Sequence, residues 1–169
     1  MKAFRKLLFP VVLSESSEII VPYVQAVATK FKSQIHLLFV ARVFDHFTSM
    51  YVPMPSIDRF AGEIFEGAQK RLYEFKDNHF NSFPNTVATV VAGDASEEIL
   101  NYIQTENVDL VVMGTHGRKG LDKVIFGSVA EQIVKTAPVP VLVVNPYRLP
   151  KDNGQANEKM EIEEEAQQR

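Results

Sequence analysis

Residues 108–136 read VDLVVMGTHGRKGLDKVIFGSVAEQIVKT. The apolar run Val108–Met113 predicts a buried strand, and Val129–Thr136 predicts a helix. The stretch between them is rich in glycine, which lets a backbone approach a ligand closely. The free N–H groups at a helix start attract anions. A strand, a glycine-rich loop and a helix start in this order therefore predict an α/β fold with a phosphate site.

The spacing of the glycines excludes the two commonest phosphate motifs, the P-loop and the dinucleotide fingerprint. It reads Gly114-x-x-Gly117, then nine residues, then Gly127-Ser128. This spacing resembles the ATP-binding pattern of the universal stress protein family, in which the glycine frame holds the phosphates. Ser128 can add a hydroxyl donor. Arg118 and Lys119 lie inside the loop, either as phosphate contacts or as a solvated pair.

The resemblance to that family extends well beyond the loop, from about Lys6 to about Asn145. It includes the opening strand 7–11, the segment 93–100 (GDASEEIL) and the closing segment 137–144 (APVPVLVV). It implies a three-layer α/β/α sandwich with a five-stranded open parallel sheet in the Rossmann-like order 3-2-1-4-5. It also implies ATP with a divalent metal, Mg²⁺ or Mn²⁺, and a homodimer that pairs the last strands, Val141–Val144.

Length and charge predict one domain and a tail. Residues 1–150 carry 15 Lys and Arg and 15 Asp and Glu, whereas residues 151–169 carry 3 and 6, which accounts for the net charge of −3. We expect a domain over residues 1–146 and an acidic, disordered tail over 147–169. The neutral domain has no excess of basic residues that could bind a phosphate backbone, so nucleic acid is not an expected partner.

Other classes of protein are also disfavoured by composition. The chain has no cysteine, which excludes disulfides, thiol catalysis and zinc–thiolate sites. No apolar run reaches the roughly 18 residues of a membrane span, and the first residues do not resemble a signal peptide. We therefore expect a cytoplasmic protein that does not bind membranes.

Apolar patterning predicts alternating strands and helices, which implies a parallel sheet with right-handed crossovers. Pro140 suits an edge strand, because proline cannot donate into a ladder. A long connection, residues 41–56, is interpreted as a lid, a contact with a second subunit, or a loop without a role. The expected strands are Leu7–Leu13, Ile35–Val40, Val87–Val91, Val108–Met113 and Val141–Val144, and the expected helices are Ser17–Phe31, Ile57–Asn78, one opened by an Asp94-x-x-Glu97 capping box, and Val129–Thr136.

An apolar stripe on the second helix is interpreted as core rather than as a cofactor site. It consists of Ile57, Phe60, Ala61, Ile64, Phe65, Ala68, Leu72 and Phe75.

In the family's strand order the ligand lies outside the carboxyl ends of the strands, where the chain reverses direction. The resemblance therefore implies a nucleotide site at the ends of the first, second and fourth strands and in the glycine loop. The candidate residues are Val11, Val12, Ser14, Val40, Ala41, Met113, Gly114, His116, Gly117, Arg118, Gly127, Ser128 and Val129.

One candidate departs from the family pattern. ATP-binding members have an aspartate that reaches the nucleoside in Pro-x-Asp-x-Ser, and this chain has Val12 there, in Pro10-Val-Val-Leu-Ser14. A hydrogen bond to a charged group contributes about 1.5–3 kcal/mol, so its loss weakens binding roughly ten- to a hundred-fold. The backbone of Val40 can still contact adenine.

Three functions remain open. The first is a regulatory, stress-associated protein that holds ATP, with cyclic AMP as an alternative ligand. The second is a slow ATPase, although Asp122 is the sole acidic residue in the loop and phosphoryl transfer needs more groups. The third is a dimeric interaction module that has lost nucleotide binding through Val12. His36, His46 and His79 have no metal-ligand spacing with one another, and His116 is interpreted as a loop residue rather than as a base.

Overall fold

The computed structural model describes residues 4–41, 55–115 and 127–147, and for residues 55–61 the backbone alone. Strands and helices alternate throughout these residues. The elements are β1 (Lys6–Pro10), α1 (Glu15–Phe31), β2 (Gln34–Ala41), α2 (Pro55–His79), β3 (Val87–Ala92), α3 (Ala95–Thr105), β4 (Leu110–Gly114), α4 (Ser128–Thr136) and β5 (Val141–Val144).

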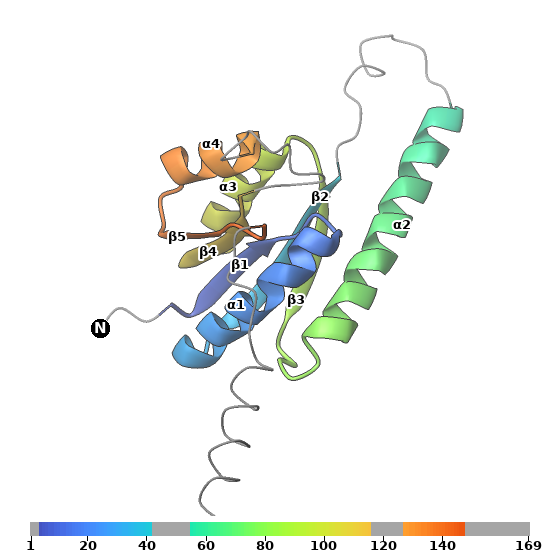
Figure 1. Cartoon of the computed structure of the whole chain (residues 1–169). Coiled ribbons are helices and arrows are strands. Elements are labelled where there is room, and N and C mark those ends of the chain that lie inside the picture. Colours follow the sequence, from blue (N-terminus) through green and yellow to red (C-terminus); the bar gives the residue numbers. More distant parts are fainter. Residues whose placement is uncertain (1–3, 42–54, 116–126, 148–169) are drawn as a thin grey trace, which may run out of the picture.

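The five strands form one parallel sheet in the order β3-β2-β1-β4-β5, as the resemblance implies. β1 lies at the centre, between β2 and β4 (Figure 1). β5 lies at one edge, and Pro140 immediately precedes it, which agrees with the prediction of an edge strand. The chain therefore reverses its direction of winding between β1 and β4.

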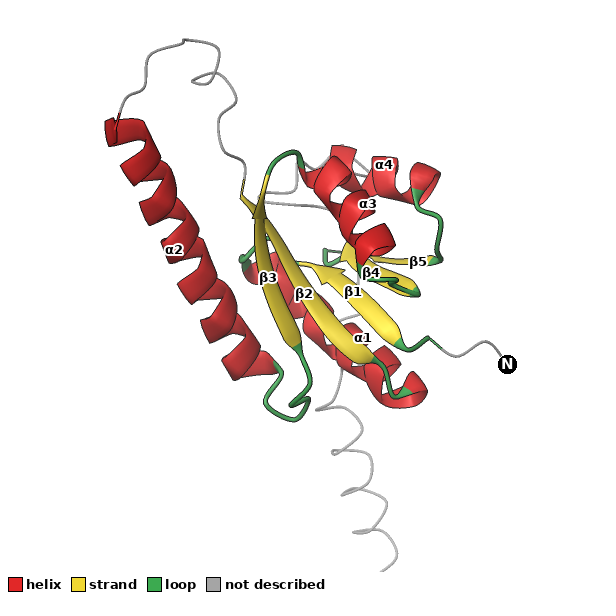
Figure 2. Cartoon of the chain, turned by 180° about the vertical axis from the view of Figure 1, so that it is seen from behind, coloured by secondary structure: helices red, strands yellow, loops and turns green. Residues whose placement is uncertain are grey.

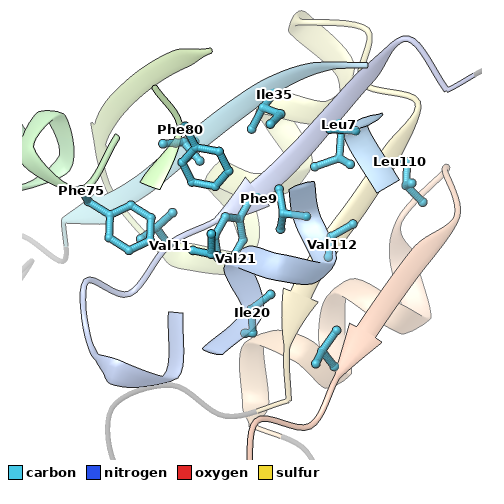
Figure 3. Close-up of a cluster of buried hydrophobic side chains, with 14 of the residues drawn as sticks. Leu7, Phe9, Val11, Ile20, Val21, Ile35, Phe75, Phe80, Leu110 and Val112 are labelled. Atoms are coloured by element: carbon cyan, nitrogen blue, oxygen red, sulfur yellow. The ribbon is translucent and has the colours of Figure 1, made fainter. Parts of the chain in front are cut away.

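Helices cover both faces of the sheet, α1 and α2 on one and α3 and α4 on the other (Figures 1 and 2). Neighbouring side chains of β1 point to opposite faces, because side chains alternate along a strand. Leu7 and Phe9 pack with α1 and α2 (Figure 3). Leu8 packs with α3 and α4. Both faces of the central strand are thus buried, which explains its continuous apolar sequence.

The strand expected over Leu7–Leu13 ends earlier, at Pro10, so that prediction is wrong at its carboxyl end. Residues 11–13 turn into α1 instead, and Leu13 has a φ of 51°. The helix begins at Glu15, with Ser14 as its N-cap. Apolar residues alone did not distinguish this turn from a strand.

The apolar stripe on α2 is core over only part of its length. Ala68, Leu72 and Phe75 are buried, as predicted. Ile64 is 44% exposed, so its assignment to the core is wrong. In Figure 1 the amino-terminal end of α2 projects past the sheet, whereas its carboxyl-terminal part lies beside β3. Of the other stripe residues, Phe65 is half-buried.

The predicted cap of α3 is confirmed. The Asp94 carboxylate accepts from the backbone N–H groups of Ser96, at 2.9 Å, and Glu97, at 3.2 Å. Before it, Gly93 has a φ of 151°, which favours glycine. Among the helices of the described residues, none combines the length and apolar character that a membrane span requires.

Candidate functional site

The expected switch point lies where β1 and β4 run side by side. Leu7 pairs with Leu110, and Leu8 with Val111. β1 ends at Pro10, directly before Val11, and β4 ends at Gly114. The first predicted site segment and the first glycine of the frame therefore lie at the carboxyl ends of neighbouring parallel strands, although about a hundred residues separate them in sequence.

The two described ends of the glycine loop meet beside this point. The backbone N–H of Thr115 donates to the carbonyl of Val144 at 2.9 Å, so the chain follows β5 for one residue beyond β4. The N–H of Gly127 then donates to the carbonyl of Thr115 at 2.6 Å. The helix α4 thus starts directly at the carboxyl end of β4.

The start of α4 presents backbone donors without a side-chain cap. Gly127 is the N-cap, and it has no side chain with which to cap the helix. Its φ of −68° is one that any residue adopts. Serine, threonine or aspartate at this position would occupy one of the first-turn N–H groups, whereas glycine does not, and it places no Cβ beside them. Ser128, the first helical residue, is exposed.

The turn after β1 is held by contacts that the sequence did not indicate. The N–H of Val12 donates to the Ser17 hydroxyl at 3.0 Å. Arg71, from α2, donates to the carbonyl of Leu13 at 3.1 Å. The hydroxyls of Ser14 and Ser16 are 2.8 Å apart. Sequence reasoning missed Arg71, because its contact depends on how α2 packs against the turn and leaves no local pattern.

The predicted site residues differ in what they can offer a ligand. The side chains of Val11, Ala41 and Met113 are buried in the core, so only their backbone groups can face a ligand. Half-buried positions are Val12, Ser14, Val40, Gly114, Gly127 and Val129. His116, Gly117 and Arg118 lie outside the described residues.

The described residues do not form a protein metal centre. No group of three or more His, Asp or Glu side chains gathers anywhere in residues 4–41, 62–115 and 127–147.

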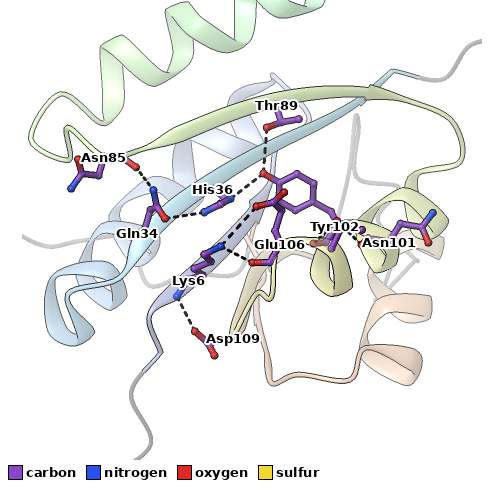
Figure 4. A network of polar contacts seen from close by, with 10 residues as sticks. Lys6, Gln34, His36, Asn85, Thr89, Asn101, Tyr102, Glu106 and Asp109 are labelled. Carbon is purple, nitrogen blue, oxygen red and sulfur yellow. Dashed lines mark hydrogen bonds and ion pairs between the residues drawn. The ribbon is translucent and has the colours of Figure 1, made fainter.

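A second polar cluster lies between β2 and α3 (Figure 4). The amide nitrogen of Gln34 donates to the carbonyl of Asn85 at 3.1 Å, which directs its amide oxygen towards His36. His36 Nε2 therefore donates to that oxygen, and Nδ1, 2.9 Å from the Tyr102 hydroxyl, accepts. The network thus selects the Nε2–H tautomer of the neutral His36 ring.

Electrostatics favour the same state of this histidine. Burial lowers the pKa of His36 from its ordinary 6.5; the positive charge of Lys6 also lowers it, and Glu106 opposes the shift. Burial raises the pKa of Tyr102 above its ordinary 10.0. His36 precedes the carboxyl end of β2 by five residues and pairs with Val87, the first residue of β3. The cluster therefore lies away from the switch point and serves the fold.

Sequence comparisons identify relatives along nearly the whole described chain. The model of the universal stress protein family matches residues 3–145. Universal stress protein MJ0577 of Methanocaldococcus jannaschii is 28% identical over 153 residues, which cover 83% of this chain and 94% of that protein. Universal stress protein MJ0531 of the same organism is 28% identical over 144 residues, covering 83% and 82%.

Solved structures share the fold. The structure of MJ0577 matches with a TM-score of 0.73 at 28% identity and covers 85% of this chain and 97% of that one. A universal stress protein solved in complex with cAMP matches with a TM-score of 0.58 at 17% identity, covering 86% and 99%. Both matches cover most of this chain and support the assignment of its fold.

Proposed function

The chain belongs to the universal stress protein family, and on this basis we propose that it holds ATP as a regulatory ligand at the switch point between β1 and β4. The observation that carries the proposal is the meeting of Gly127 and Thr115 through a 2.6 Å hydrogen bond. It brings the start of α4 to the carboxyl end of β4, where ligands of open parallel sheets bind.

In this proposal the phosphates lie against the start of α4. The uncapped N–H groups after Gly127 and the positive end of the helix dipole stabilise negative charge. The exposed Ser128 adds a hydroxyl donor. A Mg²⁺ or Mn²⁺ ion enters with the phosphates and neutralises part of their charge. Gly117 and Arg118 complete the frame from the loop.

The nucleoside lies towards β1 and β2. The half-buried Val12 and Val40 face it at the ends of neighbouring strands. Val12 supplies no carboxylate for the ribose, so we expect binding in the micromolar range or weaker. The backbone of Val40 and Ala41 supplies hydrogen-bonding groups for adenine.

Cyclic AMP is the second candidate ligand. A universal stress protein of the same fold has been solved in complex with cAMP. A cyclic nucleotide has one phosphate and no free 3′ hydroxyl, so the absence of an aspartate at position 12 would affect it less than ATP. The two ligands differ in how strongly they should depend on the start of α4.

We also propose a homodimer through the last strand. β5 is an edge strand of the sheet, and unpaired edges tend to pair with another chain. Leu142 on β5 is 40% exposed, and Val134 on α4 is 47% exposed. Pairing of two β5 strands would satisfy the edge and cover both side chains.

Titration calorimetry of nucleotide-free protein tests the ligand. ATP, ADP and cAMP are each added with and without Mg²⁺, and phosphate release is followed in parallel. We expect ATP with Mg²⁺ to bind most tightly, with little hydrolysis on the time scale of binding. If cAMP binds more tightly than ATP, cAMP is the assigned ligand. Rapid phosphate release would support an ATPase, and the absence of binding by all three nucleotides would favour an interaction module.

A further inference from the structure

Helix α1 carries two apolar stripes, and one of them packs against the sheet. Ile20, Val24 and Ala28 face the core and are buried. A second stripe, Ile19-Pro22-Tyr23-Ala26, repeats at spacings of three, one and three residues and faces outwards. Ile19 and Tyr23 are each 38% exposed. The core does not require this second stripe, because the inner residues already cover the sheet.

Charges of opposite sign flank the outer stripe. Glu15 lies four residues before Ile19, and Lys30 lies four residues after Ala26, so both extend the same face of the helix. Glu15 and Lys30 are exposed. An acid in the first turn and a base in the last also suit the helix dipole. The dipole, however, gives no reason for the apolar residues between them.

The stripe is complementary to itself under a twofold axis. When a second α1 lies antiparallel with its Tyr23 level with Pro22, Ile19 comes level with Ala26 of the second copy. The same register places Glu15 level with Lys30 of the second copy. Each pair of positions sums to 45, and the axis relates the two copies of every contact, as an isologous interface requires.

We propose that the outer face of α1 is a docking surface for a second copy of this chain, with the two helices antiparallel. The complementary charges specify the direction, and the apolar stripe supplies the buried area. Two helices over these 16 residues, about 24 Å long at 1.5 Å per residue, bury less than the roughly 800 Å² per partner of a standard interface. The association is therefore weak and depends on concentration.

This surface is separate from the β5 edge. β5 lies at the end of the sheet beside β4, whereas α1 covers one face (Figure 1). A β5 dimer would leave the outer face of α1 free, so association through α1 would convert dimers into tetramers. If the β5 edge does not pair, association through α1 converts monomers into dimers.

Charge reversal tests the proposed register. Glu15→Lys and Lys30→Glu each place like charges opposite one another in a dimer of one variant. Mixing the two variants restores opposite charges in the mixed dimer. By sedimentation equilibrium at up to about millimolar protein, we expect each variant alone to associate about tenfold more weakly than wild type, and the mixture to recover. Lys70→Glu, at a lysine on α2, is the matched control.

A mid-stripe change and a cross-link complete the test. Tyr23→Glu should remove the association that responds to residues 15 and 30. The chain has no cysteine, so Pro22→Cys, near the twofold axis, should cross-link on oxidation, whereas Lys70→Cys should not. Thermal unfolding confirms that each variant is folded.

Three results would overturn the proposal. The first is that wild-type protein, at the highest concentration, shows no association that Tyr23→Glu reduces. The outer stripe would then serve as a contact with another protein. Another is a pair of charge variants that associate as tightly as wild type. The last is a mixture that associates no more tightly than the separate variants.

Discussion

The backbone N–H of Gly127 donates to the carbonyl of Thr115 across 2.6 Å. Residue 115 ends the path of β4 beside Val144, and residue 127 caps α4, so this one bond joins the strand and the helix of the proposed phosphate cradle. Because the φ of Gly127 is ordinary, its lack of a side chain is the property that a ligand would use.

A side chain at Gly127 should weaken nucleotide binding. Gly127→Val fills space beside the first-turn N–H groups, and losing one or two charge-assisted hydrogen bonds at about 1.5–3 kcal/mol lowers affinity at least tenfold. Gly67→Val is the control, because a Cβ at Gly67 meets nothing within 4 Å. Calorimetric titration of both folded variants with ATP measures the difference. Equal affinities would remove Gly127 from the site.

Restoring the family aspartate should strengthen binding. Val12 is half-buried in the turn that follows β1, so a carboxylate there keeps contact with solvent. We expect Val12→Asp to raise ATP affinity roughly ten- to a hundred-fold, and Val12→Asn to give a smaller gain. Fluorescence competition with a labelled nucleotide measures both. If neither variant gains, the nucleoside lies elsewhere.

Stability should fall in mild acid because of His36. Burial and Lys6 lower the pKa of His36 below its ordinary 6.5, so between the two pKa values the unfolded chain binds more protons and the free energy of unfolding rises with pH. The contribution of neutral His36 is complete above about pH 6.5 and is lost as the pH falls towards the folded pKa.

Urea denaturation across this range measures the effect. His36→Gln should flatten the curve of stability against pH, because a glutamine amide does not titrate in this range. Parallel curves for wild type and His36→Gln would show that this histidine does not set the acid sensitivity.

Gly93 should resist substitution. Its φ of 151° strains any side chain, and a Cβ would lie 2.9 Å from the Glu98 side chain. We expect Gly93→Ala to cost about 1 kcal/mol or more in chemical denaturation. Adding Glu98→Ala should recover only the part due to that contact, because the backbone strain remains. Complete recovery in the double variant would attribute the cost to the contact alone.

The fold could be predicted from the sequence because local patterns and topology agreed. The apolar runs located all five strands, and the Asp94 cap located α3. The ends of elements were harder to predict where tertiary contacts decide them. β4 begins at Leu110 rather than at Val108. There the side chain of Asp109 accepts from the N–H groups of Arg5 and Lys6, a contact with no local signature.

The sequence predicted which segments form the candidate site, but not the tertiary contacts that hold those segments in place. The position of Gly114 and Gly127 follows from the strand order, which the family resemblance supplied. The bond from Arg71 to Leu13 links residues 58 apart and depends on the packing of α2. Likewise Ile64 fits the apolar stripe, but its exposure depends on how α2 packs against the rest of the protein.

Identification of a co-purified nucleotide tests the central claim most directly. The protein is purified without added nucleotide and denatured, and the released small molecules are identified by chromatography and mass spectrometry. Stripped protein is then titrated with ATP and Mg²⁺. The proposal predicts recovery of ATP or ADP, or saturable binding that Gly127→Val weakens. An empty protein that also fails to bind ATP would contradict it.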